Sequence, residues 1–267
     1  MSVFELTGRK ALVTGGARGL GHGMAEALAR AGAAVVIADV QEELGKQTAD
    51  ALCQSGAICE FVLLDVTSEA SWDQAMTQAV SALGGLDILV NNAGVEISSL
   101  VIDIEAADLR RMLEVNVLGT ALGIKHAFRA MRPGGPAGQG GAVINVASVA
   151  ATIAFPGIAG YSATKSAVDR LTRVAAMESG KLGYGVRVNC VYPGLVATEM
   201  GLQLASDVVR LGLFASVDDA IGGVVGQTPL GRLGEVPDMA DAVVFLASDG
   251  ARFITGAGLP VDGGMGM

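Results

Sequence analysis

The chain has 267 residues, of which 51% are hydrophobic and 4% aromatic, and its net charge is −9. This hydrophobic content suffices for a large core, and the length allows one or two domains. The acidic balance and the lack of a Lys/Arg cluster argue against a nucleic-acid partner. The three cysteines, Cys53, Cys59 and Cys190, lack metal-ligand spacing, so we expect reduced, packed thiols and no metal site.

One uncharged segment, residues 133–164, is long enough to suggest a membrane span. It contains several prolines and glycines, as well as Gln139 and Asn145, and these residues do not suit a transmembrane helix. No signal-peptide pattern precedes the strand-like run Ala11-Leu12-Val13. We therefore expect a soluble cytoplasmic protein without a membrane partner.

The first predicted strand, residues 10–14, leads into the run Gly15-Gly16-Ala17-Arg18-Gly19-Leu20-Gly21, and a helical pattern begins at Leu20. A strand, a glycine turn and a helix form the arrangement that binds dinucleotides. The glycines allow close approach of a pyrophosphate, and the helix N-terminus supplies free N–H groups. Glycine clusters also occur in ordinary turns, but the position after the first strand favours nucleotide binding.

The second predicted strand, residues 33–38, ends at Asp39, which Val40 and Gln41 follow. A carboxylate at this point accepts hydrogen bonds from an adenosine ribose and repels a 2′-phosphate. Arg18 could hold such a phosphate, but no basic residue follows Asp39, so the sequence predicts NAD rather than NADP. The alternative is that Asp39 caps a helix that begins near Glu42.

Strands and helices continue to alternate along the chain. Further strands are predicted at 58–64, 86–90, 142–147, 186–191 and 259–261, and further helices at 69–83, 105–131, 161–182 and 237–247. This alternation predicts right-handed βαβ crossovers. We therefore expect an α/β fold over residues 1–267: a single-domain, doubly wound parallel sheet (Rossmann fold) of about seven strands, with helices on both faces.

Lys165 is the first charged residue after Arg132. If a helix begins near Tyr161, then Tyr161 and Lys165 lie on one face, at i and i+4. An ammonium beside a phenol lowers the phenol pKa from about 10 and allows proton exchange near neutral pH. Ser148, at the end of a predicted strand, could bind the same substrate oxygen. Taken alone, a tyrosine and a lysine at this spacing more often form an ordinary surface pair.

Polar residues follow nearly every predicted strand: Thr14, Asp39, Asp65, Asn91, Ser148 and Tyr192. Ligands of doubly wound sheets bind outside the carboxyl ends of the strands. This shared position predicts an enzyme active site at that edge.

The sequence resembles the short-chain dehydrogenase/reductase family over essentially its whole length. The matching residues are Thr14-Gly15-xxx-Gly19-x-Gly21, Asp39, Asp65-Val66, Asn91-Asn92-Ala93-Gly94, Asn116, Ser148, Tyr161-xxx-Lys165 and Pro193-Gly194 with Thr198. The glycine spacing and the Tyr161–Lys165 spacing are similar to the compact oxidoreductase branch. They are unlike those of the sugar-epimerase branch and of the enoyl reductases.

The resemblance implies a role for each matching residue. Tyr161 would be the proton donor and acceptor, Lys165 would lower the pKa of Tyr161 and bind the nicotinamide ribose, and Ser148 would orient the substrate oxygen. Asn116 would hold a water that links Lys165 to solvent, or it merely interrupts its helix. Thr198 would bind the cofactor carboxamide, or it caps the following helix.

The resemblance also implies a set of cofactor-binding residues. These are Gly15, Arg18, Gly19, Leu20, Gly21, Asp39, Val40, Asp65, Val66, Asn92, Ala93, Gly94, Tyr161, Lys165, Pro193, Gly194, Val196 and Thr198.

Substrate choice is predicted to lie in a substrate-loop region, residues 195–234, with help from 95–100 and 149–158. These segments are rich in large apolar residues, and Arg210 is the one basic residue from 195 to 228. We expect a bulky, apolar secondary alcohol or ketone, alicyclic, aromatic or steroid-like. The alternatives are a 3-ketoacyl thioester reductase, which Asp39 disfavours, and a non-enzymatic NAD-binding sensor or scaffold. The resemblance further implies a homotetramer.

Overall fold

A computed structural model describes residues 3–267, which contain one sheet of seven parallel strands in the order β3-β2-β1-β4-β5-β6-β7. The strand order reverses between β1 and β4, so the sheet is doubly wound, as the sequence predicts. The strands are β1 (Lys10–Thr14), β2 (Ala34–Asp39), β3 (Cys59–Leu63), β4 (Ile88–Asn91), β5 (Gly141–Val146), β6 (Val186–Pro193) and β7 (Gly258–Val261).

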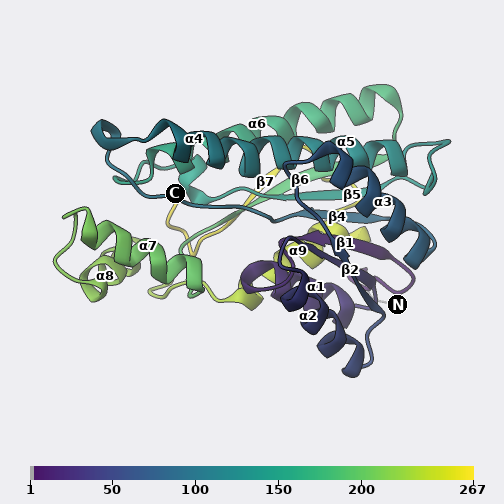
Figure 1. Ribbon diagram of the computed structural model, residues 1–267, viewed down its shortest axis with the longest axis horizontal. Helices are drawn as coiled ribbons and strands as arrows, with labels where there is room; N and C mark the ends of the chain where they lie inside the picture. Colours follow the sequence, from purple (N-terminus) through teal and green to yellow (C-terminus); the bar gives the residue numbers. More distant parts are fainter. Residues whose placement is uncertain (1–2) are drawn as a thin grey trace.

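Helices cover both faces of the sheet (Figure 1). One face carries α1 (Gly19–Arg30), α2 (Glu42–Gln54) and α9 (Val236–Ala247), and the other carries α3 (Glu69–Leu83), α5 (Gly119–Met131) and α6 (Ala159–Leu182). Each face has its own apolar core, so the central strands are buried on both sides. This double burial explains their continuous runs of Ala, Val, Leu and Ile.

The register of the central strands aligns their polar ends. Thr14 pairs with Ala38, one residue before Asp39, and Asn91 pairs with Asn145 on the next strand. Parallel strands bring their carboxyl ends to one edge of the sheet. The predicted polar residues therefore meet at that edge.

The helix predicted at 105–131 is interrupted in the structure. It consists of α4 (Ala106–Met112), a π-helical turn (Leu113–Leu118) and α5. The wider turn contains Asn116, and such turns are frequent at functional sites. Short 3₁₀ turns occur at Val101–Asp103, Val149–Ala151 and Asp249–Ala251.

The segment 195–234, which the sequence left without predicted elements, contains α7 (Glu199–Arg210) and α8 (Val217–Gln227). These two helices lie beyond the end of the sheet, at the left of Figure 1. Ala205, Val208 and Ala220 form a small apolar cluster between them, separate from the two cores of the sheet. Across residues 3–267, no helix has both the length and the apolar character that crossing a membrane requires.

Candidate active site

The glycine-rich loop between β1 and α1 depends on two glycines for its shape. A Cβ on Gly21 would lie 2.1 Å from the carbonyl oxygen of Gly15, and a Cβ on Gly15 would lie 2.9 Å from the Cα of Ala93. Gly19, at the start of α1, has φ +58° and open space where its Cβ would be. Among residues 3–267, no side chain caps this helix end. Free N–H groups beside open space suit a pyrophosphate, so the loop fits the dinucleotide that the sequence predicts.

Thr14 and Asn92 fix this loop against the end of β4. The hydroxyl of Thr14 accepts hydrogen bonds from the N–H groups of Asn92 and Ala93, both at 3.0 Å. The amide nitrogen of Asn92 donates to the carbonyl oxygens of Thr14 at 2.9 Å and Gly15 at 3.1 Å. These bonds hold the loop in shape without help from a ligand.

Asp39 faces the glycine loop from the end of β2. Its side chain is buried, and its two oxygens accept hydrogen bonds from the N–H groups of Ala17 at 3.1 Å and Gln41 at 3.0 Å. The residue that caps α2 is Gln41, so the alternative prediction that Asp39 is the helix cap is wrong. Val40, by contrast, is exposed.

The guanidinium of Arg18 is paired with a carboxylate of the α7 segment. It forms an ion pair with Glu199, the first residue of α7, and both side chains are exposed. Leu20, two residues later, packs against the apolar core under α1. The glycine loop therefore contacts the region predicted to choose the substrate.

Asp65 and Val66, the predicted adenine-flanking residues, follow β3. Asp65 accepts hydrogen bonds from the N–H and hydroxyl of Thr67, at 2.9 and 2.8 Å. The carbonyl oxygen of Val66 accepts a hydrogen bond of 3.0 Å from the indole of Trp72. Val66 also packs against Gly119, where a Cβ would come within 2.9 Å of its side chain. The backbone at the end of β3 is thus fixed from α3 and α5.

Asn116 connects the loop after β4 to α6. Its buried amide accepts a hydrogen bond from the N–H of Val95 at 2.8 Å and donates to the carbonyl of Val95 at 2.9 Å and to the hydroxyl of Thr164 at 3.0 Å. A Cβ on Gly94 would lie 3.3 Å from Asn116 Oδ1 and 3.5 Å from Lys165 Nζ. Asn116 and Lys165 therefore both border Gly94.

Ser148, Tyr161 and Lys165 meet at the end of β5. The Ser148 hydroxyl accepts a hydrogen bond of 3.1 Å from the N–H of Ala150, and it lies close enough to the Tyr161 side chain to act on the pKa of the phenol. Lys165 Nζ lies 5.5 Å from the centre of the Tyr161 ring and donates to the carbonyl of Val146 at 2.8 Å. With Asn116, the structure brings all four predicted catalytic residues together.

Comparison with known proteins identifies the family. A family model described as enoyl-(acyl carrier protein) reductase matches residues 15–266. The trans-4-hydroxycyclohexanecarboxylate dehydrogenase of Sinomonas cyclohexanicum is 39% identical over 95% of this chain and 91% of that protein. The chain belongs to the short-chain dehydrogenase/reductase family.

Two further members of the short-chain dehydrogenase/reductase family are similar over nearly their whole length. The 3-alpha-(or 20-beta)-hydroxysteroid dehydrogenase of Mycobacterium bovis is 38% identical over 97% of this chain and 90% of that protein. The structure of a gluconate 5-dehydrogenase from Burkholderia cenocepacia, in complex with NADP and tartrate, has a TM-score of 0.87 and 34% identity, and the match covers 98% of this chain and 96% of that one. The protein is thus an oxidoreductase of a family that binds a nicotinamide cofactor.

The sequence prediction that the pKa of Tyr161 is lowered is wrong. Burial raises the pKa of Tyr161 to about 12, and the Ser148 hydroxyl only partly opposes this effect. Burial also lowers the pKa of Lys165 to about 8. The prediction that Lys165 lowers the pKa of the phenol neglected the loss of solvation, which disfavours the charged form of both groups.

The remaining predicted cofactor residues lie between β6 and α7. Pro193 ends β6, and the N–H of Gly194 donates to the carbonyl of Val261 at 3.1 Å. Val196 is buried and pairs with Gly234. The hydroxyl of Thr198 accepts a hydrogen bond of 3.2 Å from the N–H of Gly201, which confirms the alternative prediction that Thr198 caps a helix.

The apolar residues predicted to bind the substrate divide into two groups. Val208 and its neighbours are buried between α7 and α8, as expected for a core-facing stripe. Leu211 and Leu213 instead approach Gly157, where an added Cβ would lie 3.2 and 3.0 Å from their methyl groups. The segment before α6 and the end of α7 thus share an apolar contact, extended by the stacked rings of Phe155 and Phe214 at 6.3 Å.

Sequence reasoning overlooked two residues that contact this site. Thr164 holds the amide of Asn116, and Glu96 follows Val95 in the loop that Asn116 binds. The segment 95–100 was predicted to help choose the substrate, but Glu96 was not singled out. The available signal was a carboxylate directly after Asn-Asn-Ala-Gly-Val in an otherwise uncharged segment.

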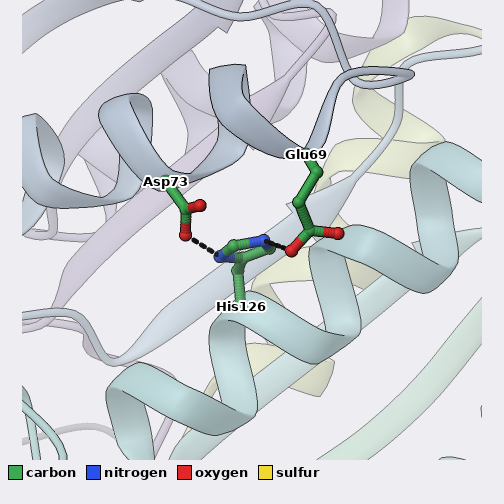
Figure 2. Close-up of side chains that lie close together, drawn as sticks. All are labelled: Glu69, Asp73 and His126. Atoms are coloured by element: carbon green, nitrogen blue, oxygen red, sulfur yellow. Dashed lines mark hydrogen bonds and ion pairs between the residues drawn. The ribbon is translucent and has the colours of Figure 1, made fainter.

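Glu69, Asp73 and His126 form one further cluster, between α3 and α5 (Figure 2). The imidazole of His126 lies 3.1 Å from a Glu69 oxygen and 3.5 Å from an Asp73 oxygen, and it stacks on Trp72. The same Glu69 oxygen also pairs with Lys125. The Lys125 ammonium at that position would repel a metal cation. We therefore interpret the cluster as a set of polar contacts that joins α3 to α5.

Proposed function

We propose that this protein is an NAD-dependent alcohol dehydrogenase that interconverts a bulky, apolar secondary alcohol and its ketone. The observation that carries this proposal is the convergence of Ser148, Tyr161 and Lys165 beside Gly94, the residue that both Asn116 and Lys165 border. A bound nicotinamide cofactor supplies the hydride acceptor in oxidation and the hydride donor in reduction.

In the proposed mechanism, protein side chains handle the proton. Ser148 holds the substrate oxygen, and the Tyr161 phenol exchanges a proton with that oxygen. In oxidation the deprotonated Tyr161 (the phenolate) takes the alcohol proton as the C–H bond breaks, and in reduction the neutral phenol gives that proton back. Lys165 and Asn116 lie behind the phenol and would pass the proton to solvent through a water held at Asn116. The raised pKa of Tyr161 suits the proton donor of ketone reduction.

Two features support NAD over NADP. Asp39 places a buried carboxylate at the end of β2, where it would accept hydrogen bonds from the ribose hydroxyls and repel a 2′-phosphate. Arg18, the basic residue of the glycine loop, is engaged by Glu199. We further propose the full cofactor-binding set named from the sequence, including Val40, Val196 and Thr198.

The substrate class follows from the apolar wall of Phe155, Leu211, Leu213 and Phe214. Relatives named for cyclohexane and steroid alcohols support an alicyclic substrate. We also propose that residues 1–267 act as one dinucleotide-binding and catalytic domain, with 195–234 as the substrate-loop region. A cytoplasmic homotetramer is proposed, supported by free cysteines and by the exposed apolar side chains of Val174 and Met177 on α6.

The test is a spectrophotometric screen of alcohols and ketones with NAD and with NADP. We expect turnover of alicyclic alcohols with NAD, and a loss of about 10²- to 10⁴-fold in kcat for Tyr161→Phe. Asp39→Ala should relax the preference for NAD. Near-normal turnover of Tyr161→Phe would refute the acid/base role, and NADH binding without oxidation of any alcohol would favour the sensor alternative.

A further inference from the structure

The carboxylate of Glu96 is held in place beside the candidate active site. On one side, the preceding residue, Val95, is bound through both backbone groups by Asn116. On the other side, the N–H of Ser99 donates to the carbonyl of Gly157 at 2.8 Å, and Ser99 pairs with Ile158 at the start of α6. Because both flanks are fixed, the position of Glu96 is set by the same segments that carry the catalytic residues.

The carboxylate of Glu96 is close enough to the phenol of Tyr161, and to Asp207 and Arg210 of α7, for the charges to interact. Its negative charge raises the pKa of Tyr161, and the charges of Asp207 and Arg210 act in turn on Glu96. Burial is the main cause of the raised pKa of Glu96 itself. Since α7 belongs to the predicted substrate-loop region, a half-buried carboxylate near both the phenol and α7 lies on the substrate side of the site.

One oxygen of Glu96 is available to a ligand. The Ser98 hydroxyl donates to Oε1 at 2.8 Å. Among residues 3–267, no group hydrogen-bonds Oε2, and no buried side-chain oxygen is left without a partner, so Oε2 is not fully buried. A partly desolvated carboxylate oxygen that stays open is an acceptor for a hydrogen-bond donor on the substrate.

We propose that Glu96 is a specificity-determining residue that accepts a hydrogen bond from a second hydroxyl group of the substrate. The preferred substrates are then alicyclic diols or hydroxyketones rather than simple cyclic alcohols. This inference rests on the proposed dehydrogenase function. A hydroxyl is favoured over a carboxylate because the Glu96 carboxylate would repel a second negative charge.

The test compares cyclohexanol with the 1,2-, 1,3- and 1,4-cyclohexanediols as substrates, with NAD as cofactor. The enzymes are the unmodified protein, Glu96→Gln, Glu96→Leu and the control Glu60→Gln, which removes an exposed carboxylate from β3. The measured quantity is the ratio of kcat/KM for each diol to kcat/KM for cyclohexanol. Circular dichroism and NADH binding establish that each variant folds.

We expect at least one diol to exceed cyclohexanol by about tenfold or more in the unmodified protein. Glu96→Leu should lower this ratio by about 10- to 100-fold, because kcat/KM for the diol falls while kcat/KM for cyclohexanol is retained. Glu96→Gln keeps an acceptor oxygen and should lose less, and Glu60→Gln should leave the ratio unchanged. A merely structural role for Glu96 would lower both substrates together.

The pH profile gives a second readout. The charges near the phenol include Glu96 and Lys165, and Asp207 and Arg210 lie beyond Glu96. Removal of the Glu96 charge by Glu96→Gln lowers the pKa of Tyr161, so the pH at which cyclohexanol oxidation rises should move downward, whereas Glu60→Gln should not move it.

The outcomes separate the inference from the proposed function. Oxidation of cyclohexanol with no preference for any diol, or a diol preference that survives Glu96→Leu, overturns the role of Glu96 and leaves the dehydrogenase intact. Absence of turnover with every alcohol overturns the proposed function, and the inference falls with it.

Discussion

The sheet edge that carries the candidate cofactor site and the α7–α8 segment are built in different ways. At the sheet edge, buried or half-buried polar side chains are bonded to backbone: Thr14, Asn92 and Asn116 each hold a neighbouring loop. In the α7–α8 segment, a small apolar cluster holds two helices together, and an exposed ion pair, Arg18–Glu199, links them to the glycine loop. The sheet edge is thus held by buried hydrogen bonds to the backbone. The α7–α8 segment is held mainly by apolar contacts and one exposed ion pair.

This contrast suits a two-part binding site. A cofactor of constant shape is best met by a preorganised surface, because no ordering of the protein then opposes binding. A segment with its own small core can change sequence or position without disturbing the sheet. The difference also predicts that the same kind of substitution has unequal effects in the two regions.

The largest difference is expected for glycine-to-alanine substitutions. In Gly21→Ala, the new Cβ would meet the backbone oxygen of Gly15 at 2.1 Å, so the loop must move. Because that neighbour is backbone, the cost should exceed about 3 kcal/mol of unfolding free energy, the upper end for overpacking. Dinucleotide affinity should fall with it, as measured by fluorescence titration with NADH.

The matched control is Gly222→Ala, in the middle of α8. Here the added Cβ meets open space, and helix propensity predicts stabilisation by about 0.5–1 kcal/mol. Urea unfolding measures both variants. If Gly21→Ala and Gly222→Ala changed the free energy of unfolding by the same amount, the two regions would not differ in how tightly they are packed.

The next largest effect concerns the buried hydroxyl of Thr14. Thr14→Val removes the acceptor of two backbone N–H groups, those of Asn92 and Ala93. Leaving two such donors unsatisfied should cost about 2–4 kcal/mol in urea unfolding. Thr77→Val, on the exposed surface of α3, loses only a bond to the carbonyl of Asp73 and should change stability by less than about 0.5 kcal/mol. A small loss for Thr14→Val would mean that water or loop movement replaces the hydroxyl.

Lys165 should make stability depend on pH in a defined window. Its pKa is lowered by burial from 10.5 to about 8, so between these values the unfolded chain binds more protons than the folded one. Stability then rises as pH increases through this window. The contribution at full span is on the order of 2–3 kcal/mol.

Comparison with Lys165→Met isolates this effect, because other titrating groups, such as Cys59 and Cys190, are common to both proteins. Between pH 8 and 10, the free energy of unfolding of the unmodified protein should increase relative to that of Lys165→Met. A constant difference across this range would show that the ammonium is not desolvated as the structure indicates.

The smallest effect is expected at the link between the two regions. Glu199→Gln breaks the ion pair with Arg18, but both side chains are exposed, so unfolding free energy should change by less than about 0.5 kcal/mol. The released guanidinium becomes available to a 2′-phosphate, and the KM for NADP should fall relative to that for NAD. The double variant Arg18→Gln/Glu199→Gln serves as control and should lose this gain.

Much of the fold could be read from local pattern. The strand at residues 10–14 is confirmed to the residue, because its apolar run is bounded by Lys10 and by the glycine loop. The position of Ser148 at the carboxyl edge of the sheet followed from the strand pattern, whereas its convergence with Asn116, Tyr161 and Lys165 was implied by the family resemblance. The interruption of the helix at 105–131 was not predicted: the π-helical turn contains Asn116, whose amide bonds to Val95 and Thr164, 21 and 48 residues away, and no local pattern displays such distant partners.

The sequence alone determined the family motifs, the alternation of strands and helices and the identity of the residues at the sheet edge. These depend on hydrophobic periodicity and short-range spacing, which a linear chain displays directly. Only the tertiary structure decided that Tyr161 and Lys165 are desolvated, that Arg18 pairs with Glu199, and that Glu96 comes close to the phenol and to α7. Solvation and pairing depend on which distant segments close around a side chain, and no local pattern specifies them.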